Sequence, residues 1–121
     1  MPFSERDWVH LRRVHALALE RFCDRVLREA AAAIEAPDQE SAHASFLALY
    51  RLVNERNAAL ATAFDDLRRS TGMHRLSALI ALDVLSDEEL AGFQPEVREN
   101  ARELSRLLLP RRAGTSEGAP E

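Results

Sequence analysis

Residues 73–85 (MHRLSALIALDVL) constrain the fold most, because their apolar side chains lie almost all the way round a helix. A helix that is apolar on all sides needs burial on all sides. We therefore expect this segment to be the central helix of a bundle, packed between longer amphipathic helices. One half of its circumference carries Leu76, Leu79, Ile80 and Val84, and the other half carries Ala78, Ala81, Leu82 and Leu85.

The first of these long helices is predicted to begin after Ser4 and to run to about Glu35. Ser4 is a good N-cap, Asp7 is placed to complete a capping box, and Phe3 can pack on Trp8. A single stripe along this helix is expected to face the core. It consists of Trp8, Leu11, His15, Leu19, Phe22, Val26, Ala30 and Ala33.

A second long helix is predicted from Gln39 to about Leu67. Pro37 interrupts the first helix, and Asp38 is the expected N-cap of the second. Because the connection is short, the two helices should form an antiparallel hairpin. The expected buried stripe of this helix is Ala42, Phe46, Leu49, Val53, Leu60 and Phe64, with Asn57 as a hydrogen-bonded polar core residue on its flank.

Two shorter helices are expected after the central one. Ser86 and Glu89 have the spacing of a capping box for a short helix that ends at Gly92. Pro95 suits the first turn of a last helix, which reaches about Leu108. The sequence thus predicts an all-α bundle of four to five helices.

Length and composition fit one helical domain over residues 1–109, followed by a disordered polar tail over residues 110–121. The 121 residues carry a formal net charge of −4, which argues against a general affinity for nucleic acid or anionic lipid. Cys23 is the only cysteine, so neither an intramolecular disulfide nor a thiolate cluster is expected. The chain has no apolar run of membrane-spanning length and no signal-peptide pattern at its start. We expect a cytoplasmic protein.

Two carboxylate and histidine pairs have the i, i+3 spacing that metal sites in helical bundles use. They are Asp7 with His10 and Glu40 with His43. Each pair lies at the start of its own helix, so an antiparallel hairpin separates them by roughly 40 Å. We therefore expect no metal and no other cofactor, with His43 on the surface.

His15 and Cys23 lie on or near the apolar stripe of the first helix. We interpret His15 as a packed, hydrogen-bonded core residue, with a pH-sensitive interface as the alternative. Cys23 has no nearby base or cation in the sequence pattern and is interpreted as a small core residue. Val14 and Leu17 fall on the otherwise polar side, where they are either scattered surface residues or a dimer contact.

The best candidate site is the end of the bundle at which the first helix starts and the second ends. Arginines, hydroxyls and the free amides of a helix start are the groups that an anion or a partner would contact. The alternative, which we favour, is a salt-bridge network with Glu5, Asp7, Asp65 and Asp66. The candidate residues are Trp8, His10, Arg12, Arg13, Arg68, Arg69, Ser70, Thr71, His74 and Arg75.

Three segments, RDW at 6–8, DDLRRST at 65–71 and SDEELAGFQPE at 86–96, together resemble a group of small bacterial all-helical proteins without an established activity. The resemblance covers most of the expected helical region, and its motifs are mainly helix caps and breaks. It implies a bacterial, all-helical protein and supplies no site residues.

The leading functional hypothesis is a protein-protein interaction or scaffold role exercised as a homodimer. A central helix of roughly 20 Å covers about half of a hairpin of roughly 45 Å, and the last helix or a second subunit must cover the rest. The alternative is a regulatory module that binds an anionic ligand or nucleic acid through Arg68, Arg69 and Arg75. Catalysis is not expected, because no nucleophile with a base and no glycine-rich loop is evident.

Overall fold

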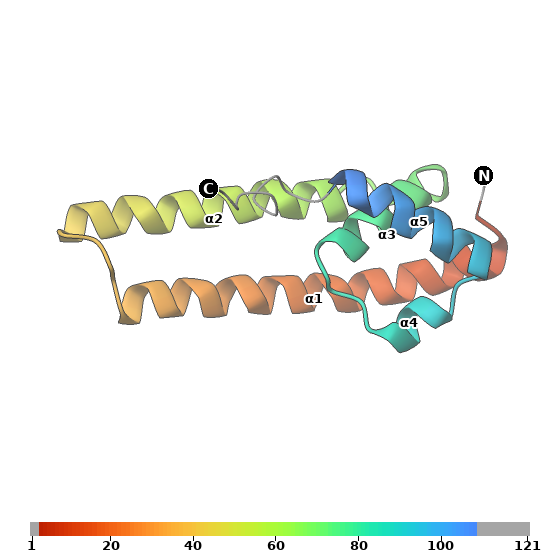
Figure 1. The fold of residues 1–121 in the computed structure, drawn as a ribbon, viewed down its shortest axis with the longest axis horizontal. Coiled ribbons are helices and arrows are strands. Elements are labelled where there is room, and N and C mark those ends of the chain that lie inside the picture. The colour runs from red at the N-terminus through yellow and green to blue at the C-terminus, as the bar shows by residue number, and fades with distance from the viewer. Residues whose placement is uncertain (1–2, 109–121) are drawn as a thin grey trace.

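The structure is a computed structural model that describes residues 3–108. Within this range the chain forms five α-helices, which confirms the predicted all-α bundle (Figure 1). The predicted tail, residues 110–121, lies outside the described residues. The elements are α1 (Glu5–Glu35), α2 (Ala42–Phe64), the 3-10 turn η1 (Arg69–Thr71), α3 (Gly72–Ala81), α4 (Asp87–Ala91) and α5 (Pro95–Leu108).

Helices α1 and α2 form the predicted antiparallel hairpin, and the three shorter helices gather at one end of it (Figure 1). This is the end at which α1 begins and α2 finishes. Helix α3 contacts both long helices, and α5 packs mainly on α3. The other half of the hairpin, toward the connection at residues 36–41, extends beyond the short helices. The core therefore sits at one end of an elongated molecule.

The central position of α3 is confirmed, because Leu76, Ser77, Ala78 and Leu79 are all buried. The helix is shorter than expected and ends at Ala81. Asp83 has a φ of 58°, in the left-handed region that ends helices. The Arg25 guanidinium donates to the carbonyls of Leu82 and Asp83, each at 2.7 Å. These bonds hold the chain across α1 where a longer helix would have continued.

Both ends of α2 differ from the prediction. Ser41, and not Asp38, is the N-cap, because the Ser41 hydroxyl accepts the Ala44 N–H at 3.1 Å. The helix ends at Phe64 and not at Leu67, since Asp66 adopts a φ of 57°. A residue in that conformation interrupts the helical hydrogen-bond pattern.

Helix α1 begins after Ser4, as predicted, but Asp7 has a different role from the one expected. Ser4 caps the helix by accepting the Asp7 N–H at 3.1 Å. The Asp7 carboxylate is buried and does not complete a capping box: it accepts the Ser4 hydroxyl at 2.9 Å and the Gln94 N–H at 3.1 Å. A buried carboxylate needs donors, and here one of them comes from the start of α5. Asp7 thereby ties the beginning of α1 to the last helix.

The face of α1 that was expected to be polar is covered by the segment between α3 and α5. One ring nitrogen of His10, Nε2, lies 2.7 Å from the Glu89 carbonyl, and Arg21 donates to the Val84 carbonyl at 2.9 Å. Val14 lies on the same face between these two contacts and is 1% exposed. Val14 is therefore a core residue, and its prediction as a dimer contact is wrong; Leu17 remains exposed.

Helix α4 begins with the predicted capping box. The Glu89 carboxylate accepts the Ser86 N–H at 2.9 Å, and the Ser86 hydroxyl accepts the Glu89 N–H at 3.1 Å. The same carboxylate receives two hydrogen bonds of 2.7 Å from Arg21. These bonds to Arg21, with those from Ser86, lower the pKa of Glu89 from 4.5 to about 2.

No helix among residues 3–108 is long and apolar enough to span a membrane.

Candidate interaction surface

Helix α2 has few charged residues and yet is fully buried only at one end. Of its 23 residues only Arg51, Glu55 and Arg56 are charged. Here only Ala63 and Phe64, at the end that meets the short helices, are fully buried. Its large exposed apolar side chains, Phe46, Tyr50 and Val53, therefore lack an intramolecular cover among the described residues.

The exposed apolar side chains of α2 share a groove with those of α1. We call this surface the hairpin groove and define it by residues that line two depressions between the long helices: Cys23, Leu27, Ile34, Phe46, Val53 and Asn57. Leu27 is 67% exposed, Ile34 65% and Phe46 65%. Tyr50, one turn from Phe46, is 61% exposed. Exposed apolar side chains that adjoin one another along two helices form a patch of the kind that marks an interaction surface.

The structure corrects the prediction that Phe46, Val53 and Asn57 are core residues. Phe46 and Val53 are exposed, and the Asn57 side chain is exposed on the flank of the groove. Leu49 and Leu60 are half-buried. Among residues 3–108 no third helix lies over the half of the hairpin next to the connection, because α3, α4 and α5 all gather at the other end.

Cys23 is half-buried and lines the groove beside Leu27, so it lies at the edge of the hairpin and not inside the core. The sequence contained a signal for this surface that the prediction missed. Cys23, Leu27, Ala30 and Ile34 follow the same alternation of four and three residues as Phe46, Tyr50, Val53 and Asn57. That spacing marks one face of a helix. The stripe on α1 lies beside the core-facing one, whereas the stripe on α2 takes in Phe46 and Val53 of the predicted buried stripe.

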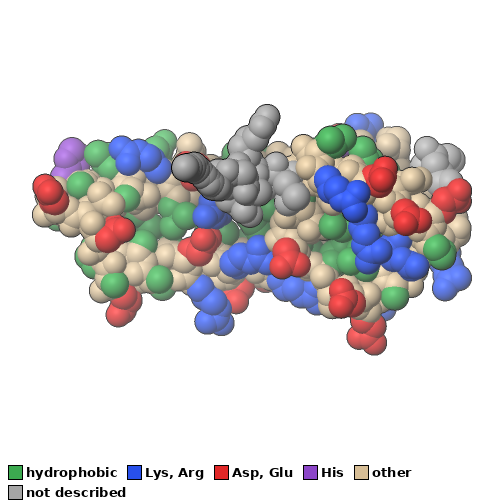
Figure 2. Space-filling view, in the orientation of Figure 1, with side chains coloured by type: hydrophobic (Ala, Val, Ile, Leu, Met, Phe, Trp, Pro, Cys, Tyr) green, Lys and Arg blue, Asp and Glu red, His purple; other side chains and the backbone are tan. Residues whose placement is uncertain are grey.

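Charges around the hairpin are paired or dispersed. Arg56 joins the two helices by donating to the Glu29 carboxylate twice, at 3.0 Å. These hydrogen bonds lower the pKa of Glu29. Figure 2 shows acidic and basic side chains interspersed over one broad face of the molecule. No strong field of one sign is visible there that would select a highly charged partner.

At the predicted arginine end, Arg68, Arg69 and Arg75 each have a polar partner. Arg68 makes two bonds to the Asp66 carboxylate, at 2.7 and 2.8 Å. Arg69 binds the Glu5 carboxylate at 2.8 Å and the Phe3 carbonyl at 3.0 Å. The Arg75 guanidinium donates to the Asp65 carbonyl at 2.7 Å. Hydrogen bonding to Arg68 lowers the pKa of Asp66.

The other residues of that candidate site make separate contacts. His10 faces α4, and Arg13 lies 3.1 Å from its second ring nitrogen. Arg12 lies over the Trp8 ring, 5.6 Å from its centroid. The Thr71 hydroxyl bonds within the turn that follows α2. Ser70 and His74 are exposed.

The two predicted carboxylate and histidine pairs lie at the starts of α1 and α2, which are opposite ends of the hairpin. His43 is exposed, as expected. Within residues 3–108 no group of three or more His, Cys, Asp or Glu side chains is placed to hold a metal ion.

The prediction that His15 is a packed core residue is confirmed. Its ring is buried against Phe64, with ring centroids 5.0 Å apart, and Nε2 lies 3.2 Å from the Ala63 carbonyl. Burial lowers the pKa of His15. A neutral ring that donates from Nε2 satisfies this contact. His15 therefore joins α1 to the end of α2 inside the core.

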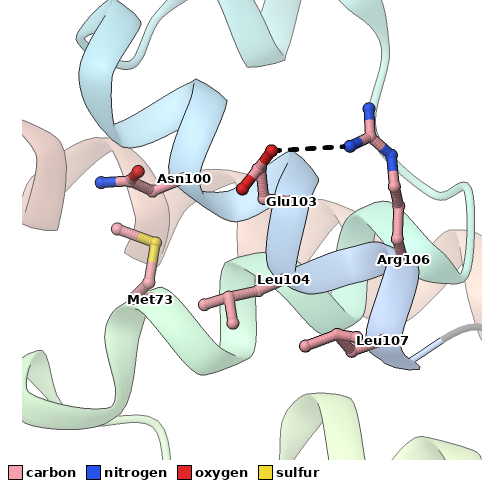
Figure 3. A pocket seen from close by; sticks show the side chains of 6 residues that line it. All are labelled: Met73, Asn100, Glu103, Leu104, Arg106 and Leu107. Atoms are coloured by element: carbon pink, nitrogen blue, oxygen red, sulfur yellow. Dashed lines mark ion pairs between the residues drawn. The ribbon is translucent and has the colours of Figure 1, made fainter.

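A second surface depression lies between α3 and α5 (Figure 3). Met73, Leu104 and Leu107 give it an apolar side, and Leu107 is 81% exposed. Arg106 points away from these three side chains, and its guanidinium lies 3.7 Å from the Glu103 carboxylate. Leu107 thus offers an exposed apolar side chain outside the hairpin groove.

Comparison with protein-family models, with curated proteins and with solved structures finds no match to this chain. The resemblance to small bacterial helical proteins therefore stays a prediction.

Proposed function

We propose that the protein is a protein-protein interaction or scaffold protein that acts as a homodimer through the hairpin groove, without catalysis. The observation that supports this proposal is the uncovered surface of α2, an almost uncharged helix with only two buried residues. Exposing such a surface to water is unfavourable, and covering it drives association. A bacterial origin and a cytoplasmic location, which suits a single unpaired cysteine, are part of the same proposal.

A second copy of the chain has the size and character that the groove requires. The 23 residues of α2 extend about 34 Å, and two adjacent helices are about 20 Å wide, so the face covers about 680 Å². Specific, stable interfaces bury about 600–1,000 Å² of accessible surface per partner, and the area of this face falls within that range. A second hairpin would bring apolar residues to apolar residues and complete a four-helix bundle.

Other occupants suit the groove less well. Residues 111–121 (RRAGTSEGAPE) contain no large apolar side chain to fill it. An unrelated helical protein is an outcome that the experiment below distinguishes, because such a partner would leave the purified chain monomeric.

The alternative, an anionic ligand or nucleic acid at Arg68, Arg69 and Arg75, has less support, because Arg68 and Arg69 pair with carboxylates and Arg75 binds a carbonyl. A thermal melt with nucleotides, polyphosphate and short DNA at low salt tests it. A shift of several degrees that is lost when the three arginines become Gln would favour the alternative. We expect no shift.

The proposed homodimer is tested by light scattering coupled to size exclusion at micromolar concentration. We expect twice the chain mass of 13.6 kDa for the wild type. Leu27→Glu and Val53→Glu should each give the monomer mass, because each buries a carboxylate in the interface. Leu107→Glu, an equally drastic change at an exposed apolar residue outside the groove, should leave the dimer intact. A wild-type mass of one chain at every concentration would overturn the proposal.

A further inference from the structure

We infer that the second copy packs antiparallel to the first, with α2 on α2 and a two-fold axis that crosses the hairpin at the level of Val53. This inference rests on the proposed function, since it names the arrangement of the homodimer. It follows from three observations: the spacing of the two apolar stripes, their alignment along the hairpin, and the position of the two polar side chains among them.

The stripe on α2 has Val53 at its centre. Phe46 and Leu60 lie seven residues away on either side of Val53. An antiparallel copy related by a two-fold axis at Val53 places Phe46 of one chain beside Leu60 of the other. The two Val53 side chains meet at the axis. At these three positions apolar residues then face apolar residues.

The stripe on α1 is centred at the same level. It runs Cys23, Leu27, Ala30 and Ile34, so its centre lies between Leu27 and Ala30. Leu27 and Val53 line the same stretch of the groove. Nearby, the Arg56 Nε and a Glu29 carboxylate oxygen lie 3.0 Å apart across the hairpin. A single two-fold axis perpendicular to the helices therefore places the α2 stripe on the α2 stripe of the second copy. The same axis places the α1 stripe on the α1 stripe of the second copy.

The polar groups distinguish this arrangement from its main alternative. Tyr50 lies three residues before Val53 and Asn57 four residues after it, so the two-fold axis brings Tyr50 of each chain to the level of Asn57 of the other. A phenol hydroxyl and a carboxamide can hydrogen-bond to each other, which satisfies both groups when the interface excludes water.

A two-fold axis that runs along the hairpin would instead lay α2 of one copy on α1 of the other. Tyr50 would then lie at the level of Ala30 and Ile34, and Asn57 at the level of Cys23 and Leu27. None of these four side chains is a strong hydrogen-bonding partner. Buried polar groups without partners destabilise an interface, so the antiparallel α2 pair is favoured.

Cysteine cross-linking in a Cys23→Ser background tests the arrangement. Val53→Cys places two thiols at the axis, and we expect an intermolecular disulfide under mild oxidation. Phe46→Cys is the matched control, also at an exposed residue of α2. Its two copies would be 14 residues apart along the antiparallel pair, or about 21 Å, which is too far for a disulfide.

The hydrogen bond is tested by the dimer dissociation constants of Tyr50→Phe, Asn57→Ala and the double variant. Each single change removes two symmetric bonds and should weaken the dimer about tenfold. The double variant should be no weaker than either single one, because both changes remove the same bonds. Additive effects would overturn the Tyr50–Asn57 contact.

The outcomes separate this inference from the proposed function. A dimeric mass without the Val53→Cys disulfide, or with an equally efficient Phe46→Cys disulfide, overturns the antiparallel arrangement and leaves the homodimer standing. A monomeric wild type at all concentrations overturns both. Selective cross-linking at Val53 in a dimer supports both.

Discussion

At the scale of single residues, two histidines of α1 hold the covered end together in different ways. His10 packs edge-on against Phe93, with ring centroids 4.6 Å apart, and its ring lies against Gly92. A Cβ at Gly92 would overlap three atoms of the His10 ring. Glycine is needed here for close approach, since its φ is an ordinary −74°. His15, in contrast, is buried among apolar residues.

Gly92→Ala should lower the free energy of unfolding by about 1–3 kcal/mol, because the new methyl group overpacks against the imidazole. Denaturant unfolding measures the change. In a His10→Ala background the same substitution should cost much less, and the double-mutant cycle isolates the overlap. Equal costs in the two backgrounds would show that His10 is not the obstacle.

His15 should make the protein sensitive to mild acid. Its folded-state pKa lies below the ordinary value of 6.5, so the unfolded chain takes up a proton first. The stabilisation of the fold by the neutral His15 ring is complete above pH 6.5 and is lost as the pH falls through the folded-state pKa. Unfolding curves between pH 7.5 and 5 should show a smaller loss for His15→Leu than for the wild type. Parallel losses in both proteins would contradict this assignment.

At the scale of elements, segment 82–91 acts as a strap across α1. Arg25 donates hydrogen bonds to the carbonyls of Leu82 and Asp83. Arg21 donates to the Val84 carbonyl and the Glu89 carboxylate, and the His10 ring contacts the Glu89 carbonyl in α4. The Glu89 carboxylate is both the cap of α4 and the partner of Arg21. A five-residue helix has little stability of its own, so these bonds and the burial of Leu90 position it.

Glu89→Gln should lower the free energy of unfolding by about 1–2 kcal/mol at pH 7. Glutamine can still cap α4, so the change isolates the ion pair with Arg21. Because pairing depresses the Glu89 pKa from 4.5 to about 2, the difference from wild type should be full above pH 4.5 and vanish as the pH approaches 2. Asp24→Asn, which breaks the exposed pair with Arg28, is the control and should cost clearly less than Glu89→Gln, because solvent screens an exposed pair.

The sequence predicted the helices better than it predicted the contacts between them. Local signals specified the start of α1 at Ser4, the capping box of α4 and the central helix, because caps and apolar periodicity act within a few residues. Val14 was misplaced because its cover, the strap, comes from a segment about 70 residues away. Phe46 and Val53 were misplaced because an apolar stripe indicates a buried face without identifying the partner that buries it.

At the scale of the whole molecule, the fold divides into a covered end and an uncovered half-hairpin. The core from Phe3 to Ala101 draws on all five helices, yet the buried residues of α2 are only the two at its end. The connection at residues 36–41 is exposed. Without a cover, the far half of the hairpin depends on a single helix-helix contact, and a second hairpin would supply the missing layer.

Cys23 provides a test, in the unmodified protein, of whether a second hairpin covers the groove, because it lines the hairpin groove and is the only cysteine. In a dimer the thiol is covered, so its alkylation requires dissociation. At a hundred times the dissociation constant we expect alkylation about tenfold or more slower than in a dilute, monomeric sample. The Val53→Glu variant is the control and should react at the rapid rate at every concentration. A wild-type rate that does not change with protein concentration would show that the groove remains open to solvent.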